Sequence, residues 1–233
     1  MALPIFYVSQ YKNEELLLLN EDTSRHVVQV LRMKKGELLQ LTDGKGSLLT
    51  TAVIDDHKKN CTVAIKEKVF NAASGRRVSI AISLLKNAAR FEWFLEKATE
   101  IGVAEIVPLK CDRTEKQHFR LDRMNNILIA AMLQSQQTWL PVLKEPILFT
   151  EAVANSASTC KLIAHCGEVA KHTIKDFAGN TSTQILIGPE GDFSYTEIEF
   201  AQARGYQPVT LGQTRLRAET AGVVAATLLC ISG

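Results

Sequence analysis

The sequence predicts an α/β protein in which a parallel sheet, with helices on both faces, follows a small β-barrel. Residues 1–70 carry short β-branched runs separated by turns, which is typical of a small closed barrel. From residue 78 onwards apolar strands alternate with helical segments, the pattern of a parallel, doubly wound sheet. The polar stretch Asn71–Arg77 between them is typical of a linker, so we expect domains at 1–72 and 76–233.

Turn and helix signals organise the first domain. Asp43–Gly46 carries two glycines between β-branched runs, and glycine tolerates the positive φ that tight hairpin turns require. One helix interrupts the strands; we expect Ser24 to cap it and Val27, Val30 and Leu31 to form its apolar face. The expected strands are Ile5–Val8, Glu37–Thr42, Ser47–Ile54 and Thr62–Val69.

The second domain alternates strands with helices. Val78–Leu85 is almost continuously apolar, as expected of a strand covered on both faces. A helix over Arg90–Ile101 should stop at Gly102, and Ser194 with Glu197 forms a capping box for a later helix. The remaining expected elements are strand Glu105–Leu109, helix Leu121–Gln137, strand Lys161–His165, a weaker helix near Glu168–Phe177, strand Gln184–Ile187, helix Tyr195–Arg204, strand Pro208–Leu211 and helix Glu219–Ile231.

Composition indicates an ordinary globular protein. Hydrophobic residues make up 46% and charged residues 22%, and the net charge of +2 neither requires nor excludes a nucleic-acid partner. We expect no membrane span and no secretory signal. The five cysteines are scattered without a CxxC pair, which favours buried thiols in a reducing cytoplasm over disulfides or zinc. His165 and Cys166 are neighbours, but adjacent strand residues point to opposite faces, which disfavours a nucleophile pair.

Two glycine-bearing turns near the C-terminus carry the functional prediction. Gly188–Gly191 follows the apolar run Ile185–Ile187, and Gly212 follows the strand that ends at Leu211. Each turn joins a strand to a helix. Because open α/β sheets hold their ligands at the carboxyl ends of their strands, we expect both turns to converge on one site.

The position of these glycines restricts the ligand. The first strand of the sheet is followed by Lys86–Arg90, which holds no glycine, and no phosphate-loop motif occurs. The turns therefore suit a ligand read by backbone groups, such as adenosine without phosphates, and S-adenosylmethionine fits that description. Gly188 and Gly191 would let the backbone approach closely, and Pro189 would stiffen the loop. A nucleotide-dependent enzyme is the weaker alternative.

Four segments together resemble the SPOUT methyltransferases and, more narrowly, the 16S ribosomal RNA (uridine-N3) methyltransferase family. Two are the glycine turns with their surroundings, LIGPEGDFS and LGQTRLRAETA. The third runs from Lys97 to Val103 and is followed by Pro108, and the fourth is His26 followed by VLRM and Gly36. The segments span nearly the whole chain. The N-terminal half of that family is a PUA-like, RNA-binding barrel, which agrees with the strands expected above.

The resemblance implies a specific fold and activity. The C-terminal strands would form a deep trefoil knot, an exception to the rule against knots, whose loops bind S-adenosylmethionine. The protein would be a homodimer that methylates N3 of a uridine in 16S ribosomal RNA, on the free RNA or the small subunit, without a metal. The last helix, Glu219–Ile231, is apolar on nearly all sides after its first turn, which suits a knot core or a dimer contact.

Residue roles are also implied by the resemblance. Uridine N3 is a weak acid, so a positive group near O2 or O4 and a carboxylate that accepts the proton would both assist attack on the methyl group. Arg217 is the candidate for the first role and Glu219 for the second. An acid at this position also stabilises a helix N-terminus, which is an equal alternative. The expected cofactor residues are Leu186, Gly188, Pro189, Glu190, Gly191, Leu211, Gly212, Leu216, Arg217 and Thr220.

Basic residues are the candidates for RNA contacts. Arg25, Gln29 and Arg32 fall on one face of the N-terminal helix and could grip phosphates, although a solvated polar face is an equal alternative. A histidine such as His26 more often packs or caps than binds. The expected RNA-binding residues are Arg25, His26, Arg32, Lys86, Arg90 and Arg113.

One segment departs from the family's pattern. At the end of the helix Leu121–Gln137 the family shows Glu-Gln-x-x-Arg, and this chain has Leu133 and Gln137 in place of the acid and the arginine. The change removes polar groups with which this helix would contact RNA or a dimer partner, and leaves the cofactor turns untouched. The rival hypothesis is a non-catalytic RNA-binding protein that keeps the knot as a dimerisation unit.

Overall fold

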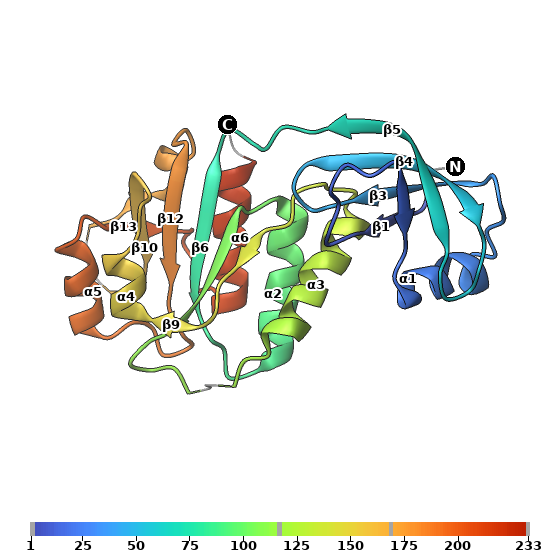
Figure 1. Ribbon diagram of the computed structural model, residues 1–233. Coiled ribbons are helices and arrows are strands. Elements are labelled where there is room, and N and C mark those ends of the chain that lie inside the picture. The colour runs from blue at the N-terminus through green and yellow to red at the C-terminus, as the bar shows by residue number, and fades with distance from the viewer. Residues whose placement is uncertain (1–2, 116–117, 168–169, 232–233) are drawn as a thin grey trace. The chain divides into compact units, whose positions relative to one another are not determined.

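The computed structural model describes residues 3–115, 118–167 and 170–231, which fold into two compact units (Figure 1). The first unit comprises Met1–Ala73 with Met132–Leu140, and the second comprises Ser74–Ala131 with Pro141–Gly233. Each unit has its own sheet and its own buried core. None of the described helices has the length and apolar character that crossing a membrane requires.

The first unit is built on a curled sheet of five strands: β1 (Ile5–Tyr7), β2 (Leu16–Leu18), β3 (Leu38–Thr42), β4 (Ser47–Asp55) and β5 (Thr62–Phe70). Their order is β1-β3-β4-β5-β2; β1 runs parallel to β3 and the other neighbours are antiparallel. Register shifts after Thr50 and Val53 mark bulges, which bend a strand and increase its twist. The curvature surrounds a core that includes Leu39, Leu41 and Val63.

The hairpin expected at Asp43–Gly46 is confirmed between β3 and β4. Gly44 has φ 67° and Gly46 has φ 98°, both in the region that favours glycine. The Asp43 Oδ1 atom accepts the backbone N–H groups of Lys45 at 2.8 Å and Ser47 at 3.1 Å. This side chain thus satisfies the donors that the turn leaves free.

The N-terminal helix begins earlier and is capped by a different residue than the sequence predicts. It consists of α1 (Glu21–Arg25) followed by one π-helical turn, η1 (His26–Val30). Asn20 caps it by accepting the N–H of Thr23 at 2.8 Å, so the prediction that Ser24 is the cap is wrong. Ser24 is buried, where its Oγ accepts the N–H of Cys61 at 3.0 Å and donates to the carbonyl of Leu19 at 3.1 Å.

The predicted apolar face of this helix is correct only for Val27, which is fully buried. Val30 and Leu31 are exposed. The N–H of Leu31 bonds the carbonyl of His26, five residues back, at 2.9 Å. This wider turn rotates the residues that follow it away from the orientation that an α-helical period predicts.

The second unit is built on eight parallel strands: β6 (Arg77–Ser83), β7 (Glu105–Lys110), β8 (Val142–Leu143), β9 (Ile147–Leu148), β10 (Cys160–Ala164), β11 (His172–Thr173), β12 (Ser182–Ile187) and β13 (Gln207–Thr210). The order is β11-β13-β10-β12-β6-β7-β8, and β9 also pairs with β7. Every pairing is parallel, as the alternating pattern predicts. The helices are α2 (Ala88–Ile101), α3 (Leu121–Gln134), α4 (Phe149–Ala154), the 3-10 turn η2 (Ile174–Phe177), α5 (Tyr195–Gln202) and α6 (Ala218–Cys230).

Helices cover both faces of this sheet (Figure 1). Ala81 of β6 joins a core cluster with residues of α4 and α5, such as Phe149 and Ala201. Its neighbour Ile82 points to the opposite face, where Gly222 of α6 and Phe94 of α2 pack together. The sheet is therefore the middle of three layers, with α4 and α5 on one side and α2 and α6 on the other.

Helix boundaries follow the expected signals. Gly102 ends α2 in a left-handed conformation with φ 94°, and the Ser194–Glu197 capping box opens α5. The weaker helix expected near Glu168–Phe177 is wrong for strand β11, while its last four residues form the 3-10 turn η2. Glu168 lies outside the described residues. The short elements β2, β8, β9 and α4 are too brief to give a periodic signal.

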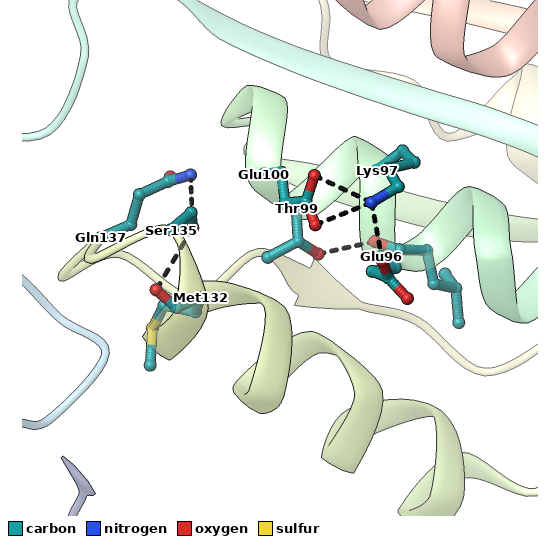
Figure 2. Close-up of polar contacts among 8 residues, drawn as sticks. Glu96, Lys97, Thr99, Glu100, Met132, Ser135 and Gln137 are labelled. Atoms are coloured by element: carbon teal, nitrogen blue, oxygen red, sulfur yellow. Dashed lines mark hydrogen bonds and ion pairs between the residues drawn. The ribbon is translucent and has the colours of Figure 1, made fainter. Parts of the chain in front are cut away.

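Helix α2 carries the lysine and glutamate of the third family-like segment. Figure 2 shows the Lys97 Nζ atom bonded to Glu96 Oε1 at 2.7 Å and to Glu100 Oε1 at 3.0 Å. The Lys97–Glu100 pair has the i,i+3 spacing at which side chains on one helix face meet, whereas Glu96 and Lys97 are neighbours in the sequence. The lysine and the acid of this segment thus pair with each other.

Candidate active site

A cavity of about 290 Å³ lies where β10, β12 and β13 end. Three loops surround it: the residues after Ala164, those after Ile187 and those after Thr210. The two glycine turns therefore converge on one cavity at the carboxyl edge of the sheet, the place where open α/β sheets bind ligands. Its lining residues are Ala164, His165, Cys166, Lys171, Ile187, Gly188, Pro189, Glu190, Asp192, Val209, Thr210, Leu211, Gly212, Gln213, Thr214, Arg215, Leu216, Ala218 and Ala221.

The loop after β12 is tied to two neighbouring loops by its own acidic side chains. Glu190 Oε1 accepts the N–H of Lys86, in the loop after β6, at 3.2 Å. Asp192 Oδ2 accepts the N–H of Cys166, in the loop after β10, at 2.7 Å. Hydrogen bonds to carboxylates are shorter and stronger than neutral ones, so these contacts fix the walls of the cavity.

A second set of contacts fixes the same loop from the β7 side. Arg113 Nη1 donates to the carbonyl of Gly191 at 2.7 Å and to that of Phe193 at 3.4 Å. Glu197 Oε1 accepts the N–H of Asp112 at 3.0 Å, and Ser194 Oγ donates to Asp112 Oδ2 at 2.6 Å. The loop is therefore held in place before any ligand arrives, which lowers the entropy that binding must overcome.

A close approach favours glycine in this loop. A Cβ atom on Gly188 would lie 3.1 Å from the backbone nitrogen of Phe193 and 3.2 Å from its ring. In the other loop Gly212 has φ 150°, a conformation that residues with a side chain rarely adopt. The two positions need glycine for different reasons, one for space and one for backbone conformation.

The predicted cofactor residues divide into two groups. Six of them line the cavity: Gly188, Pro189, Glu190, Leu211, Gly212 and Leu216. Leu186 is fully buried within β12, and Gly191 lies against the side chain of Arg113. Arg217 and Thr220 line a separate cavity at the start of α6, together with Arg90 and Glu219. Arg217 is also the residue that precedes the first turn of α6.

His165 lines the first cavity and was missed as a candidate by sequence reasoning. Its side chain is buried, and Nδ1 accepts the N–H of Gly167 at 3.1 Å. Burial lowers the pKa of His165, and the positive charge of Lys171 lowers it further. Because Nδ1 accepts, the neutral ring carries its proton on Nε2, which has no hydrogen-bond partner among the described residues. The sequence places this histidine at the end of the expected strand Lys161–His165, beside Cys166, and gives no sign of a ligand contact.

The predicted RNA-binding residues of the second unit already have protein partners. Lys86 Nζ lies 2.7 Å from Glu115 Oε2, and Arg90 Nε lies 3.6 Å from Glu219 Oε1. Arg113 holds the carbonyls of the glycine loop. Lys86 and Arg113 remain accessible, because both residues are exposed.

The predicted RNA-binding residues of the first unit lie in and next to the N-terminal helix. Arg25 pairs with Glu21 at 2.8 Å on the surface, and Arg32 is exposed with φ 57°. The ring of His26 contacts that of Phe6 edge to face, with centroids 5.4 Å apart. His26 therefore has a packing contact, while both arginines present their charge to solvent.

The departure from the family's pattern falls at the end of α3. Figure 2 shows Ser135 Oγ donating to the carbonyl of Met132 at 3.2 Å and Gln137 Nε2 donating to Ser135 Oγ at 3.1 Å. These bonds close the last turn of the helix. Gln137 thus takes part in a local hydrogen bond where the family has an arginine, and Leu133 has no polar group in place of the acid.

The fold and the loop geometry define an RNA methyltransferase domain joined to a PUA domain. A model of the RNA methyltransferase domain matches residues 73–230, and a model of the RNA methyltransferase PUA domain matches residues 19–66. Among the described residues, no group of three or more histidine, cysteine or acidic side chains is placed to hold a metal ion.

Similarity to individual proteins identifies the family within this class. The chain is 30% identical to the ribosomal RNA small subunit methyltransferase E of Synechocystis, over 97% of this chain and 76% of that protein. It resembles the crystal structure of a probable rRNA-methyltransferase from Porphyromonas gingivalis, with 36% identity, 98% of each chain covered and a TM-score of 0.91. It also resembles a putative methyltransferase from Legionella pneumophila in complex with SAM, with 30% identity, 98% and 97% coverage and a TM-score of 0.88. The chain belongs to the family of ribosomal RNA small subunit methyltransferases E.

Proposed function

We propose that this protein transfers the methyl group of S-adenosylmethionine to N3 of a uridine in the 16S RNA of the small ribosomal subunit. It is an S-adenosylmethionine-dependent ribosomal RNA methyltransferase, as its family membership and the methyltransferase–SAM complex of its Legionella relative support. The observation that carries the proposal is the cavity that the loops after β10, β12 and β13 enclose together.

The cavity suits S-adenosylmethionine. Its volume of about 290 Å³ is close to the lower end of the roughly 300–1,000 Å³ that small-molecule sites span. Gly188 lines the cavity without a side chain, and the free Nε2–H of His165 offers a donor to a ring nitrogen, a hydroxyl or a carboxylate. When bound, the cofactor supplies a methyl group already activated on a sulfonium, so the transfer itself requires no metal.

The acceptor nitrogen requires activation, for which we propose Arg217 and Glu219. Removal of the N3 proton leaves negative charge on the uridine oxygens, and the guanidinium of Arg217 would stabilise that charge. The Glu219 carboxylate would accept the proton. Both residues lie at the start of α6, next to Ala218 and Ala221 of the cofactor cavity. The cofactor contacts are proposed for the six lining residues above, and for Leu186, Gly191, Arg217 and Thr220 as neighbours of them.

We also propose a trefoil knot, a homodimer and a cytoplasmic location for this protein. Strand β13 lies between β10 and β11, which precede it in the chain, and such an insertion is compatible with a trefoil knot. Ile231, at the end of the apolar helix α6, is 63% exposed, which suits a homodimer contact. We place the protein in the cytoplasm with its ribosomal substrate. RNA would be gripped by Arg25, His26 and Arg32 of the first unit and by Lys86, Arg90 and Arg113 of the second.

The test is mass spectrometry of nucleosides from small-subunit RNA. Cells that lack this protein should lose N3-methyluridine from that RNA, and a plasmid copy should restore it. Unchanged levels of the modified nucleoside would reject the activity. Calorimetry with S-adenosylmethionine separates the rival, a non-catalytic RNA-binding protein, because that protein would show no measurable binding.

A further inference from the structure

A second cavity lies between the N-terminal part of α2 and the first turn of α6. Its volume is about 370 Å³, and it is distinct from the cofactor cavity. The two adjoin the same helical turn, because Ala218 and Ala221 line the first while Glu219 and Thr220 line the second. The six lining residues of the second cavity are Ala89, Arg90, Trp93, Arg217, Glu219 and Thr220.

Glu219 provides a buried hydrogen-bond acceptor in this cavity. The residue is only 6% exposed, and its Oε2 atom has no hydrogen-bond partner among the described residues. Its other oxygen, Oε1, lies 3.6 Å from Nε of Arg90, which holds the carboxylate in place. A buried carboxylate oxygen without a donor is unfavourable, so this atom is suited to a ligand that brings an N–H group.

Trp93 gives the same cavity an aromatic surface. It is 43% exposed, which is unusual for an indole, and it lies on α2 one turn after Arg90. Proteins that act on unpaired RNA bases commonly stack the base on an aromatic ring and read its Watson–Crick edge with hydrogen bonds. Two guanidinium groups, of Arg90 and Arg217, line the cavity and can donate to carbonyl oxygens.

We propose that this second cavity holds the target base, a uridine turned out of the RNA. The pyrimidine ring stacks on Trp93, its N3–H donates to Glu219 Oε2, and O2 or O4 accepts from a guanidinium. Arg90 is a positioning residue, because it acts through Glu219. The inference rests on the proposed function and assigns its base-binding site.

The chemistry of uridine matches these groups. The N3 proton passes to Glu219 Oε2, and the N3 electron pair forms a bond to the methyl carbon. The carbon–sulfur bond breaks with its electrons on sulfur, giving the neutral thioether product, and Glu219 then releases its proton to solvent. Cytidine has a lone pair in place of the N3 proton, so it would face the carboxylate without a donor. The cavity therefore selects uridine.

A steady-state comparison of four variants tests the assignment: Trp93→Ala, Trp93→Phe, Glu219→Gln and, as the matched tryptophan control, Trp139→Phe. We expect Trp93→Ala to raise KM for small-subunit RNA by about 5- to 150-fold, the range for loss of one stacked base. Trp93→Phe should retain most of the affinity. Glu219→Gln should lower kcat by about 100-fold or more, since a general base is lost.

The Kd for S-adenosylmethionine, measured by calorimetry, should stay within about twofold in all four proteins, because the cofactor cavity is separate. That measurement also reports that each variant is folded. A second readout is tryptophan fluorescence in the Trp139→Phe protein, which leaves Trp93 as the remaining indole of the two in the chain. Small-subunit RNA should quench that fluorescence.

Three results would overturn the inference. The first is a wild-type KM for RNA in Trp93→Ala, and the second is Trp93 fluorescence that RNA does not change. The third is a raised KM that accompanies dissociation of an oligomer in light scattering, because this surface would then belong to a second copy of the chain. A wild-type protein with no activity on small-subunit RNA would instead reject the proposed function.

Discussion

The Oδ2 atom of Asp192 accepts the backbone N–H of Cys166 at 2.7 Å, and this bond joins loops that follow two different strands. Asp192 has φ 65°, and its Oδ1 atom accepts the N–H of the next residue, Phe193, at 2.8 Å. One carboxylate thereby fixes the loop after β12 against the loop after β10. The proposed cofactor cavity owes part of its shape to this residue, which no glycine motif would identify.

Replacing Asp192 by asparagine should therefore weaken cofactor binding. Asparagine tolerates the same backbone conformation but offers one acceptor oxygen where the carboxylate offers two, so one of the two N–H groups loses its partner. We expect a loss of about 1–2 kcal/mol, or roughly 5- to 30-fold in Kd for S-adenosylmethionine, after allowing for partial exposure. Calorimetry would measure it, with exposed Asp176→Asn as control. Equal affinities in the two variants would contradict this role.

Cys166 should react faster with iodoacetamide than the other cysteines. It is exposed and lines the cofactor cavity, whereas Cys61, Cys111 and Cys160 are buried. Burial raises the pKa of Cys111 to about 12 and that of Cys230 to about 11, which suppresses their thiolates near neutral pH. S-adenosylmethionine should slow alkylation of Cys166, as followed by peptide mass spectrometry.

The control for this labelling is Cys166→Ser, which should remove the fast-reacting site and leave the slow ones. Alkylation of Cys166 at the same rate with and without saturating cofactor would show that the ligand does not occupy the cavity beside it. That outcome would count against the assignment of this cavity to S-adenosylmethionine.

The architecture was largely predictable from sequence because its signals are local. Continuous apolar runs marked buried parallel strands, and Gly102 and the Ser194–Glu197 capping box marked helix ends. The convergence of Gly188 and Gly212 on one cavity followed from the rule that strands of one parallel sheet end at one edge. These inferences needed no knowledge of side-chain contacts.

The errors have a physical cause in contacts between distant segments. The sequence predicts Ser24 as a cap because it precedes an apolar helix. In the structure Ser24 is buried, and its Oγ atom accepts the N–H of Cys61, which is 37 residues away. Val30 became exposed because a π-turn changed the helical period. His165 and Trp93 have no local signature; their significance depends on a cavity that only the folded sheet creates.

Gly222 should be intolerant of even one added methyl group. In α6 a Cβ at this position would lie 2.6 Å from Cε2 of Phe94 and 3.2 Å from Cδ1 of Ile82. Phe94 is fully buried, so a shift of its ring would disturb the close packing around it. Gly222→Ala should destabilise the fold by about 1–3 kcal/mol, although alanine favours helix by up to about 1 kcal/mol.

Thermal and denaturant unfolding would measure this change, with Gly179→Ala as the matched control, since nothing lies within 4 Å of a Cβ there. The control should stay within about 0.5 kcal/mol of the wild type. Equal stability of the two variants would mean that α2 and α6 separate more easily than their packing indicates.

His165 should make the stability of the fold depend on pH below neutrality. Its pKa is lowered from 6.5 by burial, so the unfolded chain binds a proton at a pH where the folded protein does not. The stabilisation is present above the unfolded pKa and is lost as pH falls through the lower folded pKa, with a slope of up to about 1.4 kcal/mol per pH unit.

The variant His165→Gln has no titrating group at this position. Its free energy of unfolding should therefore fall less steeply than that of the wild type below about pH 6.5. Denaturant titrations across that range, with exposed His172→Gln as control, would measure the slopes. If His165→Gln and the wild type lose stability in parallel while the pH falls, the imidazole is not held neutral in the cavity wall, and its Nε2–H is not a fixed donor for the cofactor.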